Sequence, residues 1–421
     1  MSPTRINRLL AGFLLLALPC SSQQQIPKKN IAEIRSIDPA DTNFSDLESI
    51  KTAIGDTRIL LLGEQTHGEG STYLAKTRLI KYLHEQLGFS VLAFESGFYD
   101  MARIWENTLH GSPIQKEIPG SLFYMYAQSK QMFPLFDYIQ SKVHQPDELT
   151  VTGFESQHSG EKAKTLLFPD FENFLKERNP SLLGADWEIF RRLSVATMAS
   201  RSYRPADDEK KAFFRELAAL KKSLSPNDVT PDNHFINSGG FWYRVVASIE
   251  SEALRYWGMV TGNEMAVRDL QMAENIIWLA EKVYPGKKII VWAHNVHVSK
   301  GTQSIKTAID PVNSFFSTYT PLGVTVHQHF GKAAYTIGFT AATGTFIDFN
   351  NGKLQTISPL DPNSVEAILS NTGYKYSFTN YRALKGKRAT GMLMDYIPGT
   401  TIWPEVLDGL FFIKNATPVD R

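Results

Sequence analysis

The stretch RILLLGEQTHGEG, residues 58–70, starts as a run of apolar residues and ends among glycines, an acid and a histidine. Its first half has the length and composition of a strand that is buried on both faces. Glu64 and His67 follow that run directly, and Gly63 and Gly68 are expected to let the backbone turn sharply there. The stretch therefore predicts a central strand that delivers ionisable side chains at its carboxyl end.

A helix is expected after this stretch, because its inward positions recur every three or four residues. These positions are Tyr73, Lys76, Ile80, Leu83 and Leu87. Gly88 is expected to end the helix as a C-cap. Lys76 thus lies on the inward face near the helix start. An unpaired charge there is costly, so we expect Lys76 to meet a glutamate.

Three further apolar runs end in the same way, in a carboxylate or an imidazole. Residues 91–94 lead into Glu95, residues 149–154 into Glu155, and residues 288–293 into His294 and His297. Short β-branched runs separated by helical stretches are typical of a mostly parallel sheet with crossover helices. The predicted fold class is α/β, with a mostly parallel central sheet and flanking helices. Runs at 334–339 and 409–413 are expected to add strands to the sheet.

A segment of about 170–285 is mainly helical by pattern and too long for a single crossover, so we interpret it as a large helical insertion that covers one end of the sheet. In its last helix Arg268 shares a face with apolar residues and with Asn275, which directs this arginine inward, where it is also expected to meet a glutamate. The expected helices span 171–177, 186–200, 206–224, 235–261 and 264–283, with the clearest break at 226–233.

The composition indicates a folded protein with a small, near-neutral partner. The chain has 421 residues, 43% of them hydrophobic, and a formal net charge of +1, so no electrostatic footprint for nucleic acid is visible. Residues 26–50 form a polar lead-in with one short helix expected over 46–53. No apolar stretch is long enough to predict a membrane span.

The first 22 residues predict an export signal, since Arg5 and Arg8 precede the apolar run Leu9–Leu18. The single cysteine, Cys20, stands where a bacterial lipoprotein carries its lipidated cysteine, and ordinary cleavage after Ser22 is the alternative. The mature protein is therefore expected to be periplasmic or anchored by lipid in the cell envelope. It has no internal disulfide, and a Cys-ligated metal site is excluded.

The ionisable tips of the four strands predict one functional site, because ligands of open α/β sheets bind outside the carboxyl ends of the strands. Lys76, Arg268 and Glu155 are candidates for binding substrate or stabilising an oxyanion, although Lys76 and Arg268 could equally form ion pairs with no chemical duty. The candidates for catalysis are Glu64, His67, Glu95, His294 and His297.

Several familiar chemistries are excluded by missing motifs. The chain has no G-x-S-x-G nucleophile elbow, no H-E-x-x-H zinc motif and no P-loop. What remains is a histidine flanked by carboxylates, which can take a proton from water at neutral pH. A divalent metal is the rival interpretation, since the same five residues offered for catalysis could serve as its ligands.

The sequence GEQTHG at 63–68 resembles the G-E-x-T-H-G signature of the erythromycin esterase family. Glu95 within LGFSVLAFESG, Arg268 and Asp269 within VRDLQMAENIIWLA, and the run VWAHNVHV at 291–298 match its later motifs in order. The ending LDGLFFIKNATPV is also similar, so the resemblance covers residues of about 40–415 within an expected catalytic domain of 26–415.

The resemblance implies a metal-independent hydrolase that opens the ester of a macrolide lactone such as erythromycin with an activated water, and so confers macrolide resistance. His67 resembles the general base, with Glu64 and Glu95 as acidic partners and His294 and His297 lining the cleft. The implied fold is an α/β core with a helical lobe over a deep cleft. Macrolide-hydrolysing members carry an arginine where this chain has Lys76, which puts the substrate in question more than the reaction.

Alternatives remain for the substrate, for the class of protein and for the role of the aromatic residues. The substrate could be another ester or a polysaccharide substituent, or the protein could bind a metal or haem at the cell envelope. The aromatic residues of the insertion could either form core or line the cleft, and core is favoured. They are Phe241, Trp242, Tyr243, Tyr256 and Trp257.

Overall fold

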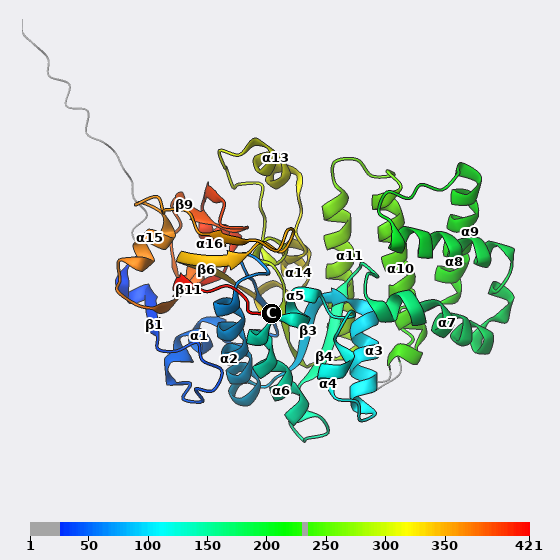
Figure 1. Cartoon of the computed structure of the whole chain (residues 1–421), viewed down its shortest axis with the longest axis horizontal. Coiled ribbons are helices and arrows are strands. Elements are labelled where there is room, and N and C mark those ends of the chain that lie inside the picture. The colour runs from blue at the N-terminus through cyan, green and yellow to red at the C-terminus, as the bar shows by residue number, and fades with distance from the viewer. Residues whose placement is uncertain (1–25, 230–234) are drawn as a thin grey trace, which may run out of the picture.

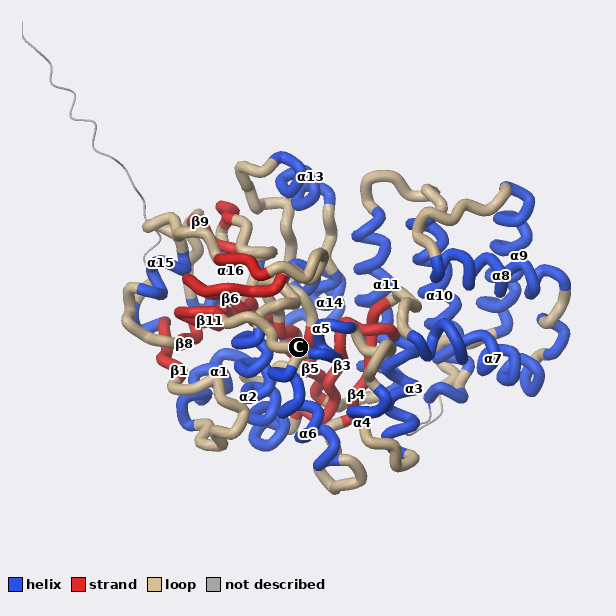
Figure 2. The backbone as a smooth tube through the Cα atoms, viewed as in Figure 1, coloured by secondary structure: helices blue, strands red, loops and turns tan. Residues whose placement is uncertain are grey.

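The computed structural model describes residues 26–229 and 235–421. The predicted export signal with Cys20, and part of the predicted break at 226–233, lie outside the described residues. Figures 1 and 2 show a sheet with helices on both sides, and a purely helical part at the right of the view. The predicted α/β class with a helical lobe is therefore confirmed.

One mixed sheet forms the core, and its strand order is β1-β8-β11-β6-β2-β5-β3-β4, with β7 paired to β6. The pairs β1–β8 and β8–β11 are antiparallel, whereas each pair from β11 across to β4 is parallel. The strands are β1 Ile31–Ile34, β2 Ile59–Leu62, β3 Phe89–Gly97, β4 Thr150–Glu155, β5 Lys288–Trp292, β6 Ala334–Ile347, β7 Leu354–Thr356, β8 Tyr376–Asn380 and β11 Gly409–Ala416. A separate hairpin pairs β9 Ala389–Met392 with β10 Pro398–Thr401.

Alternate residues of the sheet pack against helices on opposite faces, as the pleat requires. Leu60 and Leu62 of β2 belong to a core shared with α1 (Glu48–Ile54), α2 (Gly70–Leu87) and α6 (Phe133–Lys142). Ile59 and Leu61 belong to a second core shared with α10 (Gly239–Tyr256), α11 (Glu264–Trp278) and α14 (Leu322–Phe330). Because both faces of β2 are covered, an uninterrupted apolar run is what its position demands.

The helix after β2 forms as expected, and Gly88 ends it in the left-handed conformation with φ 72°. The reason for the glycines before it is different from the one predicted, since neither Gly63 nor Gly68 has a positive φ. A Cβ at Gly63 would lie 2.0 Å from Asn295 Oδ1, and one at Gly68 would lie 1.8 Å from the carbonyl oxygen of Ile347. These glycines therefore allow neighbouring segments to approach the loop closely.

The helical lobe begins at Glu161, earlier than the predicted boundary near residue 170, because Pro169 is accommodated inside a helix rather than ending one. The lobe consists of α7 Glu161–Arg178, α8 Ala185–Ala199, α9 Asp207–Ser223, α10 and α11, and α11 continues into a π-helical turn at Leu279–Val283. This lobe is the part at the right of Figure 1.

Three of the five aromatic residues, Phe241, Trp242 and Trp257, are core, as favoured, and Tyr243 and Tyr256 are partly buried against it. Phe241 stacks on Phe98 at 5.2 Å and Trp242 on Phe171 at 4.6 Å between ring centroids. The five aromatic residues considered for the cleft are all absent from the residues that line it within the described part of the chain. These side chains therefore pack the lobe internally and against α3 (Phe98–Leu109).

The segment 26–50, predicted to be a polar lead-in, contains β1, which pairs with β8 at the edge of the sheet. β1 was missed because its four residues, IAEI, are not a continuous apolar run like that of β2. The helices not yet given are α4 Ile114–Glu117, α5 Tyr124–Gln128, α12 Asn295–Val298, α13 Asp310–Thr318, α15 Val365–Ser370 and α16 Trp403–Val406. Within the described ranges no helix has the length and hydrophobicity needed to cross a membrane.

Candidate functional site

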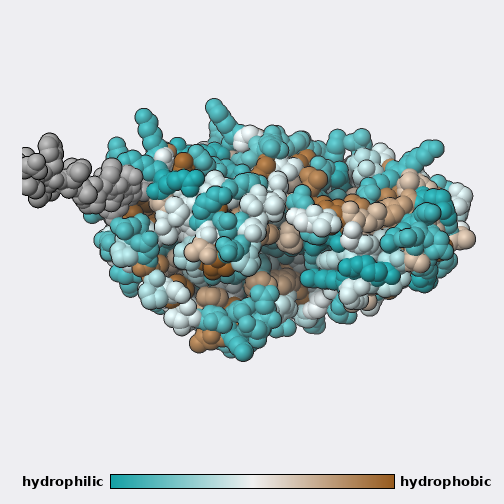
Figure 3. Space-filling view, turned by 90° about the horizontal axis from the view of Figure 1, so that it is seen from above, coloured by the Kyte–Doolittle hydropathy of each residue, from teal (hydrophilic) through white to brown (hydrophobic). Residues whose placement is uncertain are grey.

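A cleft of about 540 Å³ lies between the carboxyl ends of the central strands and the helical lobe. This volume is within the range of roughly 300–1,000 Å³ typical of small-molecule sites. Hydrophilic residues cover most of the face seen in Figure 3, and hydrophobic ones gather only in small groups. The predicted site residues that line the cleft are His67, Glu95, Glu155, Arg268, His294 and His297.

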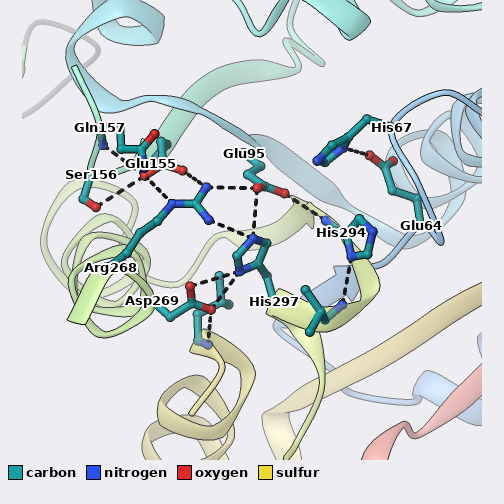
Figure 4. Close-up of polar contacts among 12 residues, drawn as sticks. Glu64, His67, Glu95, Glu155, Ser156, Gln157, Arg268, Asp269, His294 and His297 are labelled. Carbon is teal, nitrogen blue, oxygen red and sulfur yellow. Dashed lines mark hydrogen bonds and ion pairs between the residues drawn. The ribbon is translucent and has the colours of Figure 1, made fainter. Parts of the chain in front are cut away.

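His67 is held by a buried carboxylate on its inner side. Its Nδ1 lies 2.7 Å from Glu64 Oε1, and Tyr126 donates a hydrogen bond of 2.8 Å to the same oxygen. Figure 4 shows His67 and Glu64 facing each other at the loop after β2. With Nδ1–H donated to Glu64, the lone pair of His67 resides on Nε2, on the side of the ring that is free to serve the cleft.

Lys76 lies behind Glu64 and does not line the cleft, so its predicted direct contact with substrate needs correction. It is fully buried, with Nζ 2.8 Å from Glu64 Oε2 and 4.0 Å from the centre of the Trp292 ring. Burial lowers the pKa of Lys76 to about 8 in spite of Glu64, which leaves the ammonium protonated at pH 7. The expected partnership with a glutamate is confirmed.

Glu64 is ionised in this environment. Burial alone would raise its pKa, but Lys76 and His67 together hold the pKa below its usual value. A carboxylate fixed between an ammonium and an imidazole sets the tautomer of His67 and stabilises the imidazolium when His67 accepts a proton. Glu64 therefore acts on His67, because it too is absent from the cleft lining among the described residues.

His294 lies beside His67, with ring centroids 5.3 Å apart. Its Nδ1 accepts a hydrogen bond of 3.1 Å from the backbone N–H of Val296, so the ring proton is on Nε2. Burial, reinforced by His67 and His297, lowers the pKa of His294 to about 3. His294 is thus a neutral imidazole that donates through Nε2, the kind of group that can polarise a carbonyl without being an acid.

His297 is the opposite case, a protonated imidazole held by carboxylates. Its Nδ1 lies 2.9 Å from Asp269 Oδ2 and its Nε2 lies 3.2 Å from Glu95 Oε1. Burial alone would lower the pKa of His297, but Asp269 and Glu95 raise it to about 10. A group that keeps its proton at neutral pH is not available to accept one from water, which leaves His67 as the candidate for that role.

Arg268 joins two of the strand tips, as Figure 4 shows. Its Nε donates to Glu155 Oε1 at 3.1 Å and Nη2 donates to Glu95 Oε1 at 3.2 Å, with a second bond from Nη2 to Glu155. Nη1 also lies 2.9 Å from His297 Nε2. Two neighbouring cations are tolerated here because three carboxylates surround them, and the predicted glutamate partners of Arg268 are confirmed.

Asp269 was named in a sequence motif but given no role, and it is central to this cluster. It is fully buried and accepts hydrogen bonds from Tyr319 Oη at 2.5 Å and from the backbone N–H of Leu322 at 2.9 Å. It shares a buried helical face with Met272 and Ile276. The argument that singled out Arg268 as a charge on an apolar face applies to Asp269 as well.

The ring nitrogens of the three histidines are largely engaged by protein groups, namely Nδ1 of His67, Nδ1 of His294 and both nitrogens of His297. Over residues 26–229 and 235–421, no group of three or more His, Cys, Asp or Glu side chains has an arrangement suited to a metal ion. In this structure the residues that the sequence offered as metal ligands are joined by hydrogen bonds and ion pairs.

The unfolding free energy should show the raised pKa of His297. In the folded protein this pKa is about 10 against 6.5 for a free imidazole, so protonation stabilises the fold fully below pH 6.5 and the benefit is lost as pH rises through about 10. Urea unfolding of the wild type and of His297→Asn should give a difference that shrinks steadily across this range. A difference that does not change with pH would contradict the assignment of a protonated His297.

The chain is similar in sequence to known proteins over most of its length. The description of the family model that matches residues 84–414 is Erythromycin esterase. YbfO of Bacillus subtilis (strain 168), a presumed hydrolase by its name, is 28% identical over 91% of this chain and 89% of its own. The erythromycin esterase type II of Escherichia coli is 24% identical over 81% of this chain and 85% of its own.

A solved structure shares the fold. It is the erythromycin esterase EreC, a histidine-to-asparagine mutant in its open conformation, with a TM-score of 0.65 and 18% identity. The match covers 92% of this chain and 98% of that one. At this identity the likeness concerns the fold alone.

Proposed function

The chain belongs to the erythromycin esterase family, and from this premise we propose that it hydrolyses a carboxylic ester with a water activated by His67. Its assignment as a hydrolase is supported by the family match and by the names of both relatives. The proposal that His67 activates water rests on one observation. His67 Nδ1 is paired with the buried Glu64, and this pairing presents the opposite ring nitrogen to a cleft.

The reaction can be written with these groups. His67 Nε2 takes a proton from water as the water oxygen attacks the ester carbonyl carbon. The carbonyl oxygen gains negative charge, which the Nε2–H of the neutral His294 stabilises. The bond between the carbonyl carbon and the ester oxygen then breaks, and the leaving alkoxide takes the proton from His67. The products are an acid and an alcohol, and His67 is restored.

A second cluster of charged residues, formed by His297 and Arg268 with their carboxylate partners, has a different role in this reaction. His297, Arg268 and their carboxylates are paired with one another, so they hold the cleft wall and fix Glu95. Glu95 in turn accepts the backbone N–H of His294 at 2.9 Å, which positions the loop that bears the proposed oxyanion donor. We assign the second cluster to positioning, and the His67–His294 pair to the chemistry.

The macrolide lactone ring is the candidate substrate, by analogy with the relative named as an erythromycin esterase. The apolar part of the cleft, with Phe123, Met265 and Phe349 among its residues, suits a large amphiphilic molecule. Conversion of a macrolide would make the protein a resistance enzyme. Export to the periplasm or a lipid anchor at Cys20 would place it in the path of the drug, and we propose no macromolecular partner.

Incubation of the purified protein with erythromycin, with and without a chelator, tests this proposal. We expect a product heavier by one water, formed equally in both samples because the proposed base is an imidazole and no cofactor is required. Loss of turnover with chelator would contradict metal independence. Absence of product from macrolides of any ring size would overturn the proposal of a macrolide substrate. If the same sample hydrolyses simple aryl esters, the proposal of an ester hydrolase would still hold.

A further inference from the structure

Arg255 is a buried arginine of the cleft that the proposed chemistry does not use. It lines the cleft near the end of α10 and is 7% exposed. Its Nε and Nη1 have no hydrogen-bond partner in the described part of the chain. The contact that it does make is with a ring, since its guanidinium carbon lies 4.9 Å from the centre of Tyr256.

The carboxylates nearest to Arg255 are already engaged by other groups. Glu155 and Glu252 influence its charge through space. Glu155 is held by Arg268, and Glu252 accepts the backbone N–H of His158 at 2.6 Å. A buried guanidinium with N–H groups that donate to no acceptor is costly for the folded protein. An anion brought in by a ligand would remove that cost.

A second arginine faces the same ring from a different element. Arg201, between α8 and α9, also lines the cleft, and its guanidinium carbon lies 5.8 Å from the centre of Tyr256. Its side chain donates a long hydrogen bond, 3.3 Å from Nη2 to Gln157 Oε1. Two guanidinium groups thus gather at the lobe side of the cleft, around one aromatic ring.

The two ends of the cleft therefore have different chemistry. His67 and His294 stand at the sheet side, and Arg255 with Arg201 at the lobe side, with Arg268 and Glu155 between them. The sheet side can hold an uncharged carbonyl group, whereas the lobe side offers the donors that suit an oxyanion, a carboxylate or a phosphate.

We propose that Arg255 and Arg201 form a subsite for an oxyanion of the substrate, so that the preferred ester carries a carboxylate or phosphate group remote from the bond that is cleaved. This inference rests on the proposed ester hydrolysis and narrows its substrate class. Erythromycin carries an amine and no acid group, so the subsite predicts faster turnover of an acidic ester than of erythromycin.

Binding of matched, uncleavable probes tests the subsite directly. The probes are dicarboxylic acid mono-anilides from the succinic to the sebacic acid, the corresponding phosphonates, and the neutral primary amides of equal length. Calorimetry on the wild type should show the best-fitting acid binding about ten- to hundredfold more tightly than its amide, the value of one or two charge-assisted hydrogen bonds. The carboxylate and phosphonate arms distinguish the two oxyanions.

Variants assign any preference to the arginines. Arg255→Met should abolish most of the difference between acid and amide, and Arg255→Lys should retain part of it, because the charge stays and the planar fork is lost. The control Arg215→Met removes an exposed arginine of the same lobe, which pairs with Asp186, and should leave the preference unchanged. Equal binding of acids and amides by the wild type would overturn the subsite whether or not a variant folds.

Hydrolysis of the matching 4-nitrophenyl esters separates this inference from the proposed function. Preference for the acid probes without hydrolysis of any ester would leave the subsite standing and remove the esterase. Hydrolysis of the neutral esters, with no preference for the acids in either binding or turnover, would do the reverse. Erythromycin turned over faster than every acidic ester would also overturn the subsite.

Discussion

His67→Asn should lower kcat for ester hydrolysis by on the order of 10² to 10⁴, the usual contribution of a positioned general base. Asparagine keeps a donor that can reach Glu64, so the carboxylate stays bonded in the interior, but it provides no nitrogen that can accept a proton from water. The expected result is a loss in kcat with a modest change in KM, because ground-state contacts with the substrate are largely kept.

The control for this variant is His329→Asn, at an imidazole that is 44% exposed and lies 3.8 Å from Glu281. It should keep full activity. Thermal unfolding of both variants shows whether the loss in His67→Asn is chemical, since its melting temperature should stay close to that of the wild type. Activity of His67→Asn within a few fold of the wild type would remove His67 as the base.

Arg268→Met should lower the free energy of unfolding by about 3–5 kcal/mol, the usual result of removing one partner from a buried ion pair. The arginine side chain is 11% exposed and its partners Glu95 and Glu155 are 7% and 8% exposed. Without it, these two carboxylates and Asp269 would have His297 as the one remaining cation of the cluster. Urea unfolding followed by tryptophan fluorescence measures the loss.

The same chemical change at a surface arginine provides the comparison. Arg215 also holds a carboxylate with two hydrogen bonds, to Asp186, but its side chain is 63% exposed. Water screens that pair, so Arg215→Met should leave the unfolding midpoint almost unchanged. Equal losses in the two variants would show that the cluster around Arg268 contributes no more than a surface pair.

The sequence was most informative for strands that are covered on both faces. β2, β4 and β5 agree with the predicted runs to within one residue at each end, because strands buried on both faces are short runs of mainly apolar and β-branched residues. Their order in chain and sheet then brings the acids and histidines to one edge. β1 and β7 were not predicted, and β6 extends eight residues past its predicted end.

The sequence did not predict how deeply each charged side chain of the site is buried. Lys76 and Arg268 both lie on inward helical faces, yet the first is sealed beneath Glu64 and the second lines the cleft. Which of the two reaches the cleft depends on what packs above each helix, and that information comes from segments far away in the chain. The same holds for Arg255. That it lacks a hydrogen-bonded carboxylate is known only once the contacts of the neighbouring glutamates in the folded chain are known.

The strand order also determines when the site can exist during synthesis. β2 has both of its neighbours late in the chain, since Ile59 pairs with Ile289 on one side and with Ala334 on the other. The last strand, Gly409–Ala416, lies inside the sheet between β6 and β8. Nearly the whole polypeptide must therefore be synthesised before the loop with His67 is fixed. Pairings this remote in sequence make folding slow, and a chain shortened at its end should lose the site together with the sheet.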